Sequence, residues 1–174
     1  MRARIDKSRI SGVLTAPPSK SYTIRALFAA ASAAGVSSIS NPLISDDTEA
    51  TAEVLSQLGA RIKRQPGNWI VSGGHLSPSS RPLNCRQSAA TLRFLVPLCA
   101  IIEGESHITF APGLARRPLT PLLNALAQSG IETELTDIGL KIRGGRFRTS
   151  QVSLPGNVSS QFISGLLLAA PLSP

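Results

Sequence analysis

The chain has 174 residues, of which 42% are hydrophobic, and this is enough for one domain with a sizeable core. Its 18 Lys and Arg against 10 Asp and Glu give a net charge of +8, which predicts anionic partners. Aromatic residues make up only 4%, so base-stacking platforms for nucleic acid are not expected. The longest apolar run, 162–172, is too short to span a bilayer, and the first residues lack the apolar segment of a signal peptide. We therefore expect a cytoplasmic protein that binds neither membrane nor nucleic acid.

The two cysteines do not predict a metal centre. Cys85 and Cys99 are 14 residues apart, and the two histidines are not at ligand spacing from them. Reduced, buried thiols are the expectation for both.

Residues 13–72 predict the order β-α-β-α-β-β. Apolar residues at helical spacing mark the first helix, and Ser45-Asp46-Asp47 are typical N-capping residues for the second. A Pro66-Gly67-Asn68 turn separates the last two strands. The expected elements are a strand near 13–14, a helix over 22–34, a strand over 36–40, a helix from 46 to 58, and strands over 61–64 and 69–72.

The rest of the chain predicts the same order again. Pro97 lies inside a helix and is expected to kink it, and Pro112-Gly113 is expected to form a loop. The expected elements are helices over 88–102, 118–128 and 159–169 and strands over 107–110, 131–135, 140–142 and 151–154.

A short pattern recurs three times at a spacing of 68 residues, in 23–27, 91–95 and 159–163. The repeat gives Arg25, Arg93 and Gln161 equivalent places. A period this long favours an α/β unit copied in tandem rather than a solenoid. We predict units of about 15–74 and 83–145 and an incomplete unit, 150–174. Because the first helix of each unit is apolar on nearly all sides, we expect pseudo-threefold packing with helices inside and sheets outside.

Each of these first helices begins after a small or polar loop. Helix N-termini offer free N–H groups and a positive dipole end, so they bind anions. The alternative is that the Ser and Thr residues only cap helices. If the starts share one face, they gather Lys20, Ser21, Arg25, Arg93, Ser159, Ser160 and Gln161.

Three further charged groups have both a functional and a structural interpretation. Arg116-Arg117 precede a proline at a helix entry, where they form either an anion clamp or a solvated pair. Asp46-Asp47 are interpreted as N-caps or as counterions for Lys20 or Arg93. The segment 143–148 contains an RGG element, for which a basic turn between strands is the favoured interpretation.

Four ordered motifs resemble the signatures of the 5-enolpyruvylshikimate-3-phosphate synthases (3-phosphoshikimate 1-carboxyvinyltransferases). They are Pro17-Pro18-Ser19-Lys20-Ser21 with Arg25, Ser45-Asp46-Asp47-Thr48, Ala115-Arg116-Arg117-Pro118-Leu119 and Val158-Ser159-Ser160-Gln161-Phe162. The resemblance implies transfer of the carboxyvinyl group of phosphoenolpyruvate to the 5-hydroxyl of shikimate 3-phosphate, with release of phosphate. It implies two similar globules, each of three βαβαββ units, and no metal or organic cofactor.

The resemblance also implies roles for individual residues. Those for shikimate 3-phosphate are Lys20, Ser21, Arg25, Ser159, Ser160 and Gln161. Those for phosphoenolpyruvate are Lys20, Ala89, Arg93, Arg117 and Gln161. Lys20 is the implied catalytic residue, and Asp47 would support the cationic cluster.

One segment departs from the family pattern. Where the family commonly has Asn-Ala-Gly-Thr-Ala-x-Arg or Asn-Ser-Gly-Thr-Thr-x-Arg, this chain has Gln87-Ser88-Ala89-Ala90-Thr91-Leu92-Arg93. Ala89 replaces a glycine that lines the phosphoenolpyruvate pocket. We expect the added methyl group to reduce sensitivity to glyphosate, the bulkier competitor.

The family resemblance places the acid–base residues in a second globule. We therefore expect residues 1–14 to form a strand that packs on that globule, and we expect the chain alone to bind shikimate 3-phosphate weakly without turnover. The apolar end, 166–172, is expected to be exposed and prone to aggregation. Three alternatives are a UDP-N-acetylglucosamine carboxyvinyltransferase fragment, a small basic RNA-binding module and a non-catalytic half that needs a complementing chain.

Overall fold

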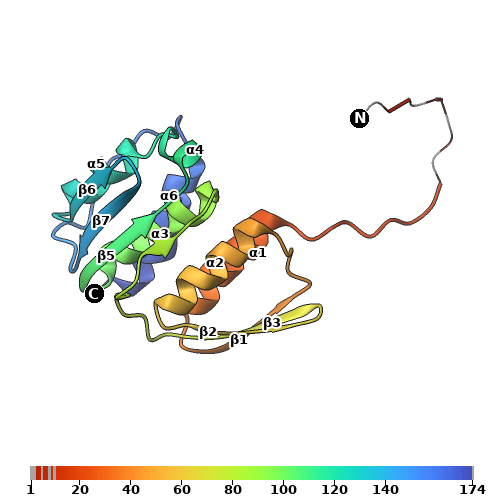
Figure 1. The fold of residues 1–174 in the computed structure, drawn as a ribbon, viewed down its shortest axis with the longest axis horizontal. Helices are drawn as coiled ribbons and strands as arrows, with labels where there is room; N and C mark the ends of the chain where they lie inside the picture. Colours follow the sequence, from red (N-terminus) through yellow and green to blue (C-terminus); the bar gives the residue numbers. More distant parts are fainter. Residues whose placement is uncertain (1–2, 5, 8, 10, 174) are drawn as a thin grey trace.

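The computed structural model describes residues 3–4, 6–7, 9 and 11–173. Its first part is a three-stranded antiparallel sheet covered on one face by two helices (Figure 1). The elements are α1 (Lys20–Ser32), β1 (Gly35–Ser40), α2 (Asp46–Gln57), β2 (Arg61–Gln65) and β3 (Asn68–Gly73). The strand order is β1-β3-β2, with Gly35 opposite Gly73 and Arg61 opposite Ser72.

The second part is a four-stranded sheet of order β4-β5-β7-β6, in which only the β4–β5 pair is parallel. Helices α3 and α5 contact this sheet, and α6, which follows it in the chain, packs along α3. The elements are β4 (Leu83–Asn84), α3 (Ala89–Ile101), β5 (Gly104–Thr109), α4 (Pro112–Ala115), α5 (Thr120–Gln128), β6 (Glu132–Thr136), β7 (Gly139–Gly144), α6 (Ser160–Ala169) and the 3-10 helix η1 (Ala170–Leu172).

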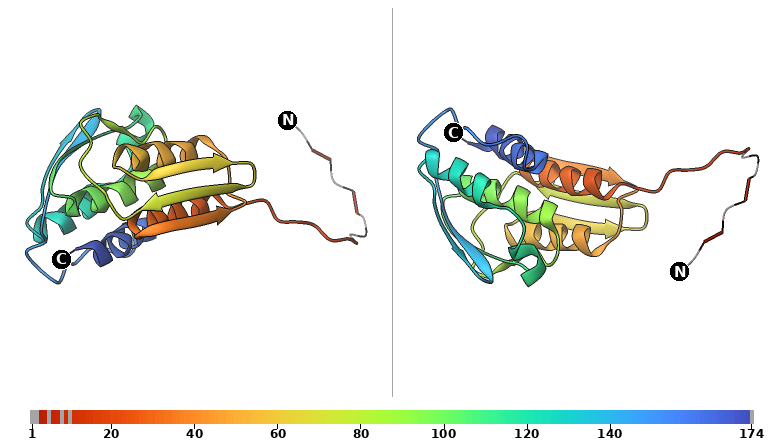
Figure 2. Two further views of the ribbon diagram at one scale, coloured as in Figure 1. Left: turned by 90° about the horizontal axis from the view of Figure 1, so that it is seen from below. Right: turned by 90° about the horizontal axis from the view of Figure 1, so that it is seen from above.

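The helices lie between the two sheets, as Figures 1 and 2 show from three sides. Helix α3 is the centre of this arrangement, because it contacts α1, α2, α5 and α6. Ten of its 13 residues are buried, as expected for a helix that is apolar on nearly all sides. The predicted α/β class, with tandem units, inner helices and outer sheets, is confirmed.

Two stacking contacts repeat between the copies. The Arg25 guanidinium lies 5.0 Å from the centre of the Phe94 ring, and the Arg93 guanidinium lies 5.0 Å from the centre of the Phe162 ring. Each phenylalanine follows its arginine by 69 residues and therefore belongs to the next copy. The edge of one ring also meets the face of another between Phe28 and Phe94, whose centroids are 5.6 Å apart.

Helices α3 and α6 approach closely at a glycine. Pro97 lies inside α3 and cannot donate to the Arg93 carbonyl four residues earlier. A Cβ added at Gly165 of α6 would lie 2.4 Å from this carbonyl oxygen and 3.2 Å from Pro97 Cγ. The small residue and the proline therefore permit this helix contact together.

Two predicted strands were wrong. Val13 and Leu14 are fully exposed, form no strand and have no neighbouring strand to pair with. The remaining described residues of 1–14 are also outside any strand, and residues 1, 2, 5, 8 and 10 lie outside the described part. That residues 1–14 pack as a strand on a second globule stays a prediction. Residues 151–154 are not a strand either, because the Gln128 side chain bonds both backbone groups of Ser153, at 2.8 and 2.9 Å. The first copy therefore begins with its helix.

Three smaller expectations also differ from the structure. Pro112-Gly113 begin the short helix α4 instead of a loop, and α5 begins at Thr120 instead of residue 118. The RGG element is not a turn between strands: Arg143 and Gly144 are the last two residues of β7, where Arg143 faces Glu132 at 3.8 Å, and only residues 145–148 follow that strand. Asp46 and Asp47 are not caps, because Ser45 is the N-cap of α2 in a capping box with Thr48.

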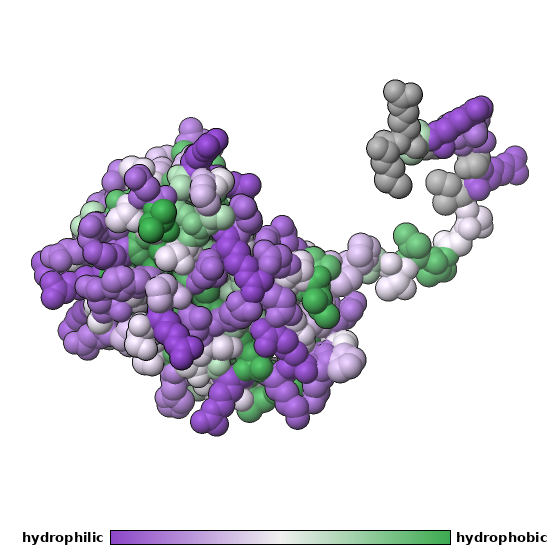
Figure 3. Space-filling view, in the orientation of Figure 1, coloured by the Kyte–Doolittle hydropathy of each residue, from purple (hydrophilic) through white to green (hydrophobic). Residues whose placement is uncertain are grey.

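The face shown in Figure 3 is mainly hydrophilic, with small separate apolar patches. The apolar end of the chain is partly exposed as expected: Leu167 exposes 68% of its surface and Leu172 38%. In the part of the chain that the structure describes, every helix is too short or too polar to cross a bilayer.

Candidate anion-binding site

A cavity of about 570 Å³ lies where four helices begin. The first two residues of α1, α3 and α6 and the second residue of α2 reach it, together with Arg117 from the segment between α4 and α5. Its lining residues are Lys20, Ser21, Ile24, Asp47, Gln87, Ala89, Ala90, Arg93, Arg117, Ser159, Ser160 and Gln161. The helix starts predicted to share one face therefore do so.

A serine caps each of the three equivalent helices. The hydroxyls of Ser19, Ser88 and Ser159 accept hydrogen bonds from the backbone N–H groups of Tyr22, Thr91 and Gln161, respectively. Each cap satisfies one of the four N–H groups that a helix start leaves unpaired. Capping and site formation are thus compatible, and the first-turn residues Ser21, Ala90 and Ser160 line the cavity.

The acidic residues are distributed unequally among these helix starts. Helices α1, α3 and α6 have none in their first turns, whereas α2 has Asp46, Asp47 and Glu49. The positive dipole end of α2 is therefore already balanced, while the other three are not. An anion is best placed between α1, α3 and α6.

Lys20 and Asp47 form an ion pair at the edge of the cavity. Lys20 Nζ lies 2.6 Å from Asp47 Oδ2, and the side chains are 51% and 21% exposed. The pair orients the ammonium group without using all of its three donors. Asp47 is thus a counterion of Lys20, and its support of a ligand-binding cluster stays a prediction.

Arg93 is held from three sides. It donates to Gln161 Oε1 at 2.7 Å and to Ser159 Oγ at 3.2 Å, and its other terminal nitrogen is 3.4 Å from the Pro118 carbonyl oxygen. Burial lowers the pKa of the Arg93 guanidinium, and the positive charge of Arg117 lowers it further. Because arginine stays protonated even so, two cations face each other here.

The lining residues carry a net positive charge. Lys20, Arg93 and Arg117 contribute three positive charges and Asp47 one negative charge, which leaves +2 in the cavity. Cations and helix N-termini that converge in this way suit a ligand with several anionic groups, such as a phosphate or a carboxylate.

Arg25 is the predicted site residue that the structure does not bring into the cavity lining. Its guanidinium stacks on Phe94 and donates to the Ser21 backbone carbonyl at 3.1 Å. The repeat predicted equivalent places for Arg25, Arg93 and Gln161, and this is wrong for Gln161. Arg25 is the sixth residue of α1 and Arg93 the fifth of α3, but Gln161 is only the second residue of α6. Arg93 and Gln161 nevertheless meet, since α6 begins later relative to the repeat.

Three lining residues were missed as site residues: Ile24, Gln87 and Ala90. Gln87 lies just before Ser88, the N-cap of α3, and Ala90 is the second residue of that helix. Their positions at a helix start could have identified them as site residues. Ile24 was assigned only to the core by its apolar spacing, and it is fully buried.

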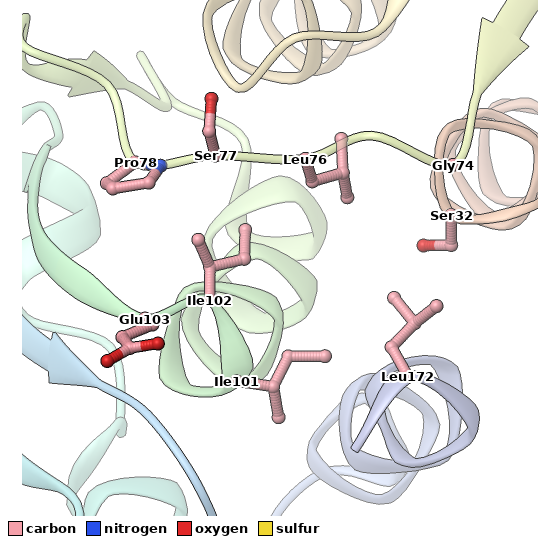
Figure 4. A pocket seen from close by; sticks show the side chains of 9 residues that line it. All are labelled: Ser32, Gly74, Leu76, Ser77, Pro78, Ile101, Ile102, Glu103 and Leu172. Atoms are coloured by element: carbon pink, nitrogen blue, oxygen red, sulfur yellow. The ribbon is translucent and has the colours of Figure 1, made fainter. Parts of the chain in front are cut away.

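A second cavity of about 340 Å³ has the opposite character. It lies at the C-terminal ends of α1 and α3, beside Ser32 and Ile101. Figure 4 shows the apolar side chains of Leu76, Ile102 and Leu172 around it. Helix C-termini carry negative partial charge, so this cavity does not suit an anion.

Cys85 and Cys99 are fully buried free thiols, as expected. Burial raises the pKa of both, that of Cys99 to about 12. Protonated thiols are neither nucleophiles nor metal ligands. Among the described residues there is also no group of three or more His, Cys, Asp or Glu that could hold a metal ion.

Comparison with known proteins supports one family. Residues 5–174 match the family described as EPSP synthase (3-phosphoshikimate 1-carboxyvinyltransferase). A protein of that enzyme name from Dehalococcoides mccartyi strain BAV1 is 48% identical over 173 residues, which are 98% of this chain and 41% of the relative. One from Nitrosopumilus maritimus is 37% identical over 175 residues, covering 99% of this chain and 42% of the relative.

Solved structures agree. An EPSP synthase from Acinetobacter baumannii has a TM-score of 0.84 at 25% identity, over 93% of this chain and 38% of that structure. A second structure of that enzyme has a TM-score of 0.82 at 26% identity, over 93% and 39%. The chain spans about two fifths of the length of the curated relatives it matches, 41% for the one from D. mccartyi.

Proposed function

The chain belongs to the EPSP synthase family, and we propose that it supplies part of the active site for carboxyvinyl transfer from phosphoenolpyruvate to the 5-hydroxyl of shikimate 3-phosphate. The observation that carries the proposal is the meeting of Lys20, Arg93 and Arg117 at three helix starts without first-turn acidic residues. Both substrates are multiply charged anions, so a cavity of net charge +2 fits them.

The two substrates would occupy different parts of the cavity. Ser159, Ser160 and Ser21 would hold the phosphate of shikimate 3-phosphate between the starts of α6 and α1, where hydroxyls and backbone N–H groups are available. Arg93 and Arg117, on the α3 side, would bind phosphoenolpyruvate, and Lys20 would lie between the two. Gln161 would contact both ligands while it orients Arg93 through its 2.7 Å hydrogen bond.

The chemistry suits this arrangement. Transfer forms a bond between the 5-oxygen of the acceptor and the vinyl carbon, and it breaks the bond between that carbon and the phosphate oxygen. The hydroxyl proton leaves the 5-oxygen, so that the products are the carboxyvinyl ether and inorganic phosphate. Fixed cations stabilise the charge that develops on the departing phosphate. Holding both reactants side by side adds the advantage of proximity.

The proposal includes a second globule. Because the chain spans 41% of its D. mccartyi relative, we assign the acid–base groups to a part equivalent to the remaining length. The described residues before α1 run outward as extended chain (Figures 1 and 2), and we propose that this segment packs on that part. The reaction would use no metal or organic cofactor and take place in the cytoplasm.

Neighbouring arginines provide the binding test. Arg117 lines the cavity and Arg116 does not, so Arg117→Ala and Arg116→Ala remove the same charge at adjacent positions. Calorimetric titration with phosphoenolpyruvate should show at least about tenfold weaker binding for Arg117→Ala, since bonds to charged groups contribute about 1.5–3 kcal/mol. Arg116→Ala should stay within about twofold of the parent, and equal effects of the two would contradict the site.

A chimera tests the transfer reaction. Residues 1–174 replace the matching 41% of the D. mccartyi relative, and release of phosphate from both substrates is measured. We expect turnover that Lys20→Ala abolishes. A folded chimera that binds both substrates without turnover would refute the proposed activity.

A further inference from the structure

The turn that precedes α3 has an unusual residue in it. Arg86 has a φ of 51°, one of two positive values found for non-glycine residues in the described part of the chain. The Ser88 N–H donates to the Cys85 carbonyl at 2.9 Å and closes the turn. Residues with a Cβ avoid this backbone region, and such outliers persist only when their surroundings hold them.

The Arg86 side chain is held by helix α2. One terminal nitrogen bonds Asp46 Oδ1, and the other bonds Glu53 Oε1 at 2.6 Å. Only 31% of the arginine side chain is exposed, and the hydrogen bonds to the two carboxylates raise its pKa. Its backbone is fixed as well, because its N–H donates to Asn84 Oδ1 and its carbonyl accepts from Ala111, both at 2.9 Å.

A buried chain of hydroxyls makes a second link between α2 and α3. Thr51 Oγ1 lies 2.7 Å from Thr91 Oγ1, which donates to Ser88 Oγ at 2.6 Å. The Asp47 carbonyl oxygen, 2.8 Å from Thr51 Oγ1, is an alternative acceptor for the single Thr51 hydroxyl proton. All three hydroxyl side chains are fully buried, so the two helix starts are joined inside as well as at the surface.

We propose that Arg86 is a positioning residue for the phosphoenolpyruvate side of the site. It ties the segment 87–90, whose Gln87, Ala89 and Ala90 line the cavity, to the helix that carries Asp47. The segment and the Lys20–Asp47 pair then keep a fixed separation across the cavity. This inference rests on the proposed function, which assigns phosphoenolpyruvate to the α3 side.

Four variants of the full 174-residue chain test this role. Arg86→Gln removes the clamp and keeps the strained backbone, Arg86→Gly removes both, and Arg86→Lys keeps the charge. Arg64→Gln is the matched control, because Arg64 also pairs with α2, at 3.0 Å from Glu49, but is outside the cavity lining. The measurements are dissociation constants for phosphoenolpyruvate and for shikimate 3-phosphate, and the backbone amide chemical shifts of Ala89 and Ala90.

We expect Arg86→Gln and Arg86→Gly to weaken phosphoenolpyruvate binding about tenfold and to leave shikimate 3-phosphate within twofold. Arg86→Lys should recover part of the loss, and Arg64→Gln should change neither constant. Equal weakening of both ligands, or unchanged binding of phosphoenolpyruvate, would overturn the role. If the unmodified chain binds neither substrate, the proposed function fails. The positioning role is then still tested by the amide chemical shifts of Ala89 and Ala90, and it would be refuted if Arg86→Gly left those shifts unchanged.

Discussion

Lys20 Nζ and Asp47 Oδ2 lie 2.6 Å apart, so helices α1 and α2 meet where both reach the cavity. Asp47 has two opposing effects there. It holds the ammonium group in place, and it also lowers the positive charge that an incoming anion experiences.

Asp47→Asn separates these effects. Removing the carboxylate raises the net charge of the lining from +2 to +3. A unit charge at about 4 Å is worth about 1 kcal/mol in water, so inorganic phosphate should bind a few-fold more tightly at low salt. Turnover of the chimera should fall, because Lys20 loses its fixed partner.

Glu49→Gln is the control, since Glu49 is in the same helical turn but pairs with Arg64 outside the cavity lining. Calorimetric titration with phosphate compares both variants with the parent. Weaker phosphate binding in Asp47→Asn would mean that orientation of Lys20 outweighs the change in charge.

Ala89→Gly should increase inhibition of the chimera by glyphosate. Ala89 lines the cavity at the start of α3, and we expect its methyl group to take up space that a bulkier competitor would need. Ala90→Gly is the control at the next lining position and should have a smaller effect. Inhibition constants measured against phosphoenolpyruvate decide the matter, and equal values for the parent and Ala89→Gly would refute the idea.

Gly165→Ala should destabilise the protein and Gly156→Ala should not. A Cβ at Gly165 would lie 2.4 Å from the Arg93 carbonyl oxygen, whereas nothing lies within 4 Å of one at Gly156. Overpacking of this kind costs about 1–3 kcal/mol. Urea unfolding of both variants gives the difference in free energy, and similar values would contradict the close approach of α3 and α6.

The buried thiols predict a loss of stability at alkaline pH. The folded-state pKa of Cys99 is about 12, and that of Cys85 is also raised. In the unfolded chain both titrate near 8.5. Below about pH 8.5 the thiols therefore do not change the free energy of unfolding with pH. Above it, the free energy of unfolding should fall by up to about 1.4 kcal/mol per thiol and pH unit, because only the unfolded chain loses these protons.

Unfolding measured at pH 8 and 9.5 tests this dependence, with the Cys85→Ala, Cys99→Ala double variant as the control. The variant should have the flatter profile. Identical slopes for both proteins would show that the thiols do not control stability in this range.

Most of the helices and paired strands were predictable because their patterns are local, but the short elements β4 and α4 were not expected. Apolar spacing and capping serines define α1, α2, α3 and α6 within one or two residues of their observed starts. The segments 13–14 and 151–154 were not, because two to four alternating residues form a strand only beside a partner. The two hydrogen bonds between the Gln128 side chain and the Ser153 backbone cannot be predicted from the sequence around either residue.

The site was predictable as a set of helix starts, but its internal geometry was not. Nothing local distinguishes Arg93, which enters the cavity, from Arg25, which stacks on Phe94 outside the lining. The difference is that Arg93 also donates to Ser159 and Gln161 at the start of α6, whereas Arg25 donates to the Ser21 carbonyl within its own helix. Likewise, the positive φ of Arg86 could not be predicted from the sequence, because the carboxylates that hold its side chain, Glu53 and Asp46, are 33 and 40 residues away.

The stacking of Arg25 on Phe94 and of Arg93 on Phe162 couples each copy to the next through a single aromatic ring. A substitution at any of these four positions therefore disturbs two copies at once, whereas the loss of a contact within one copy leaves its neighbour intact.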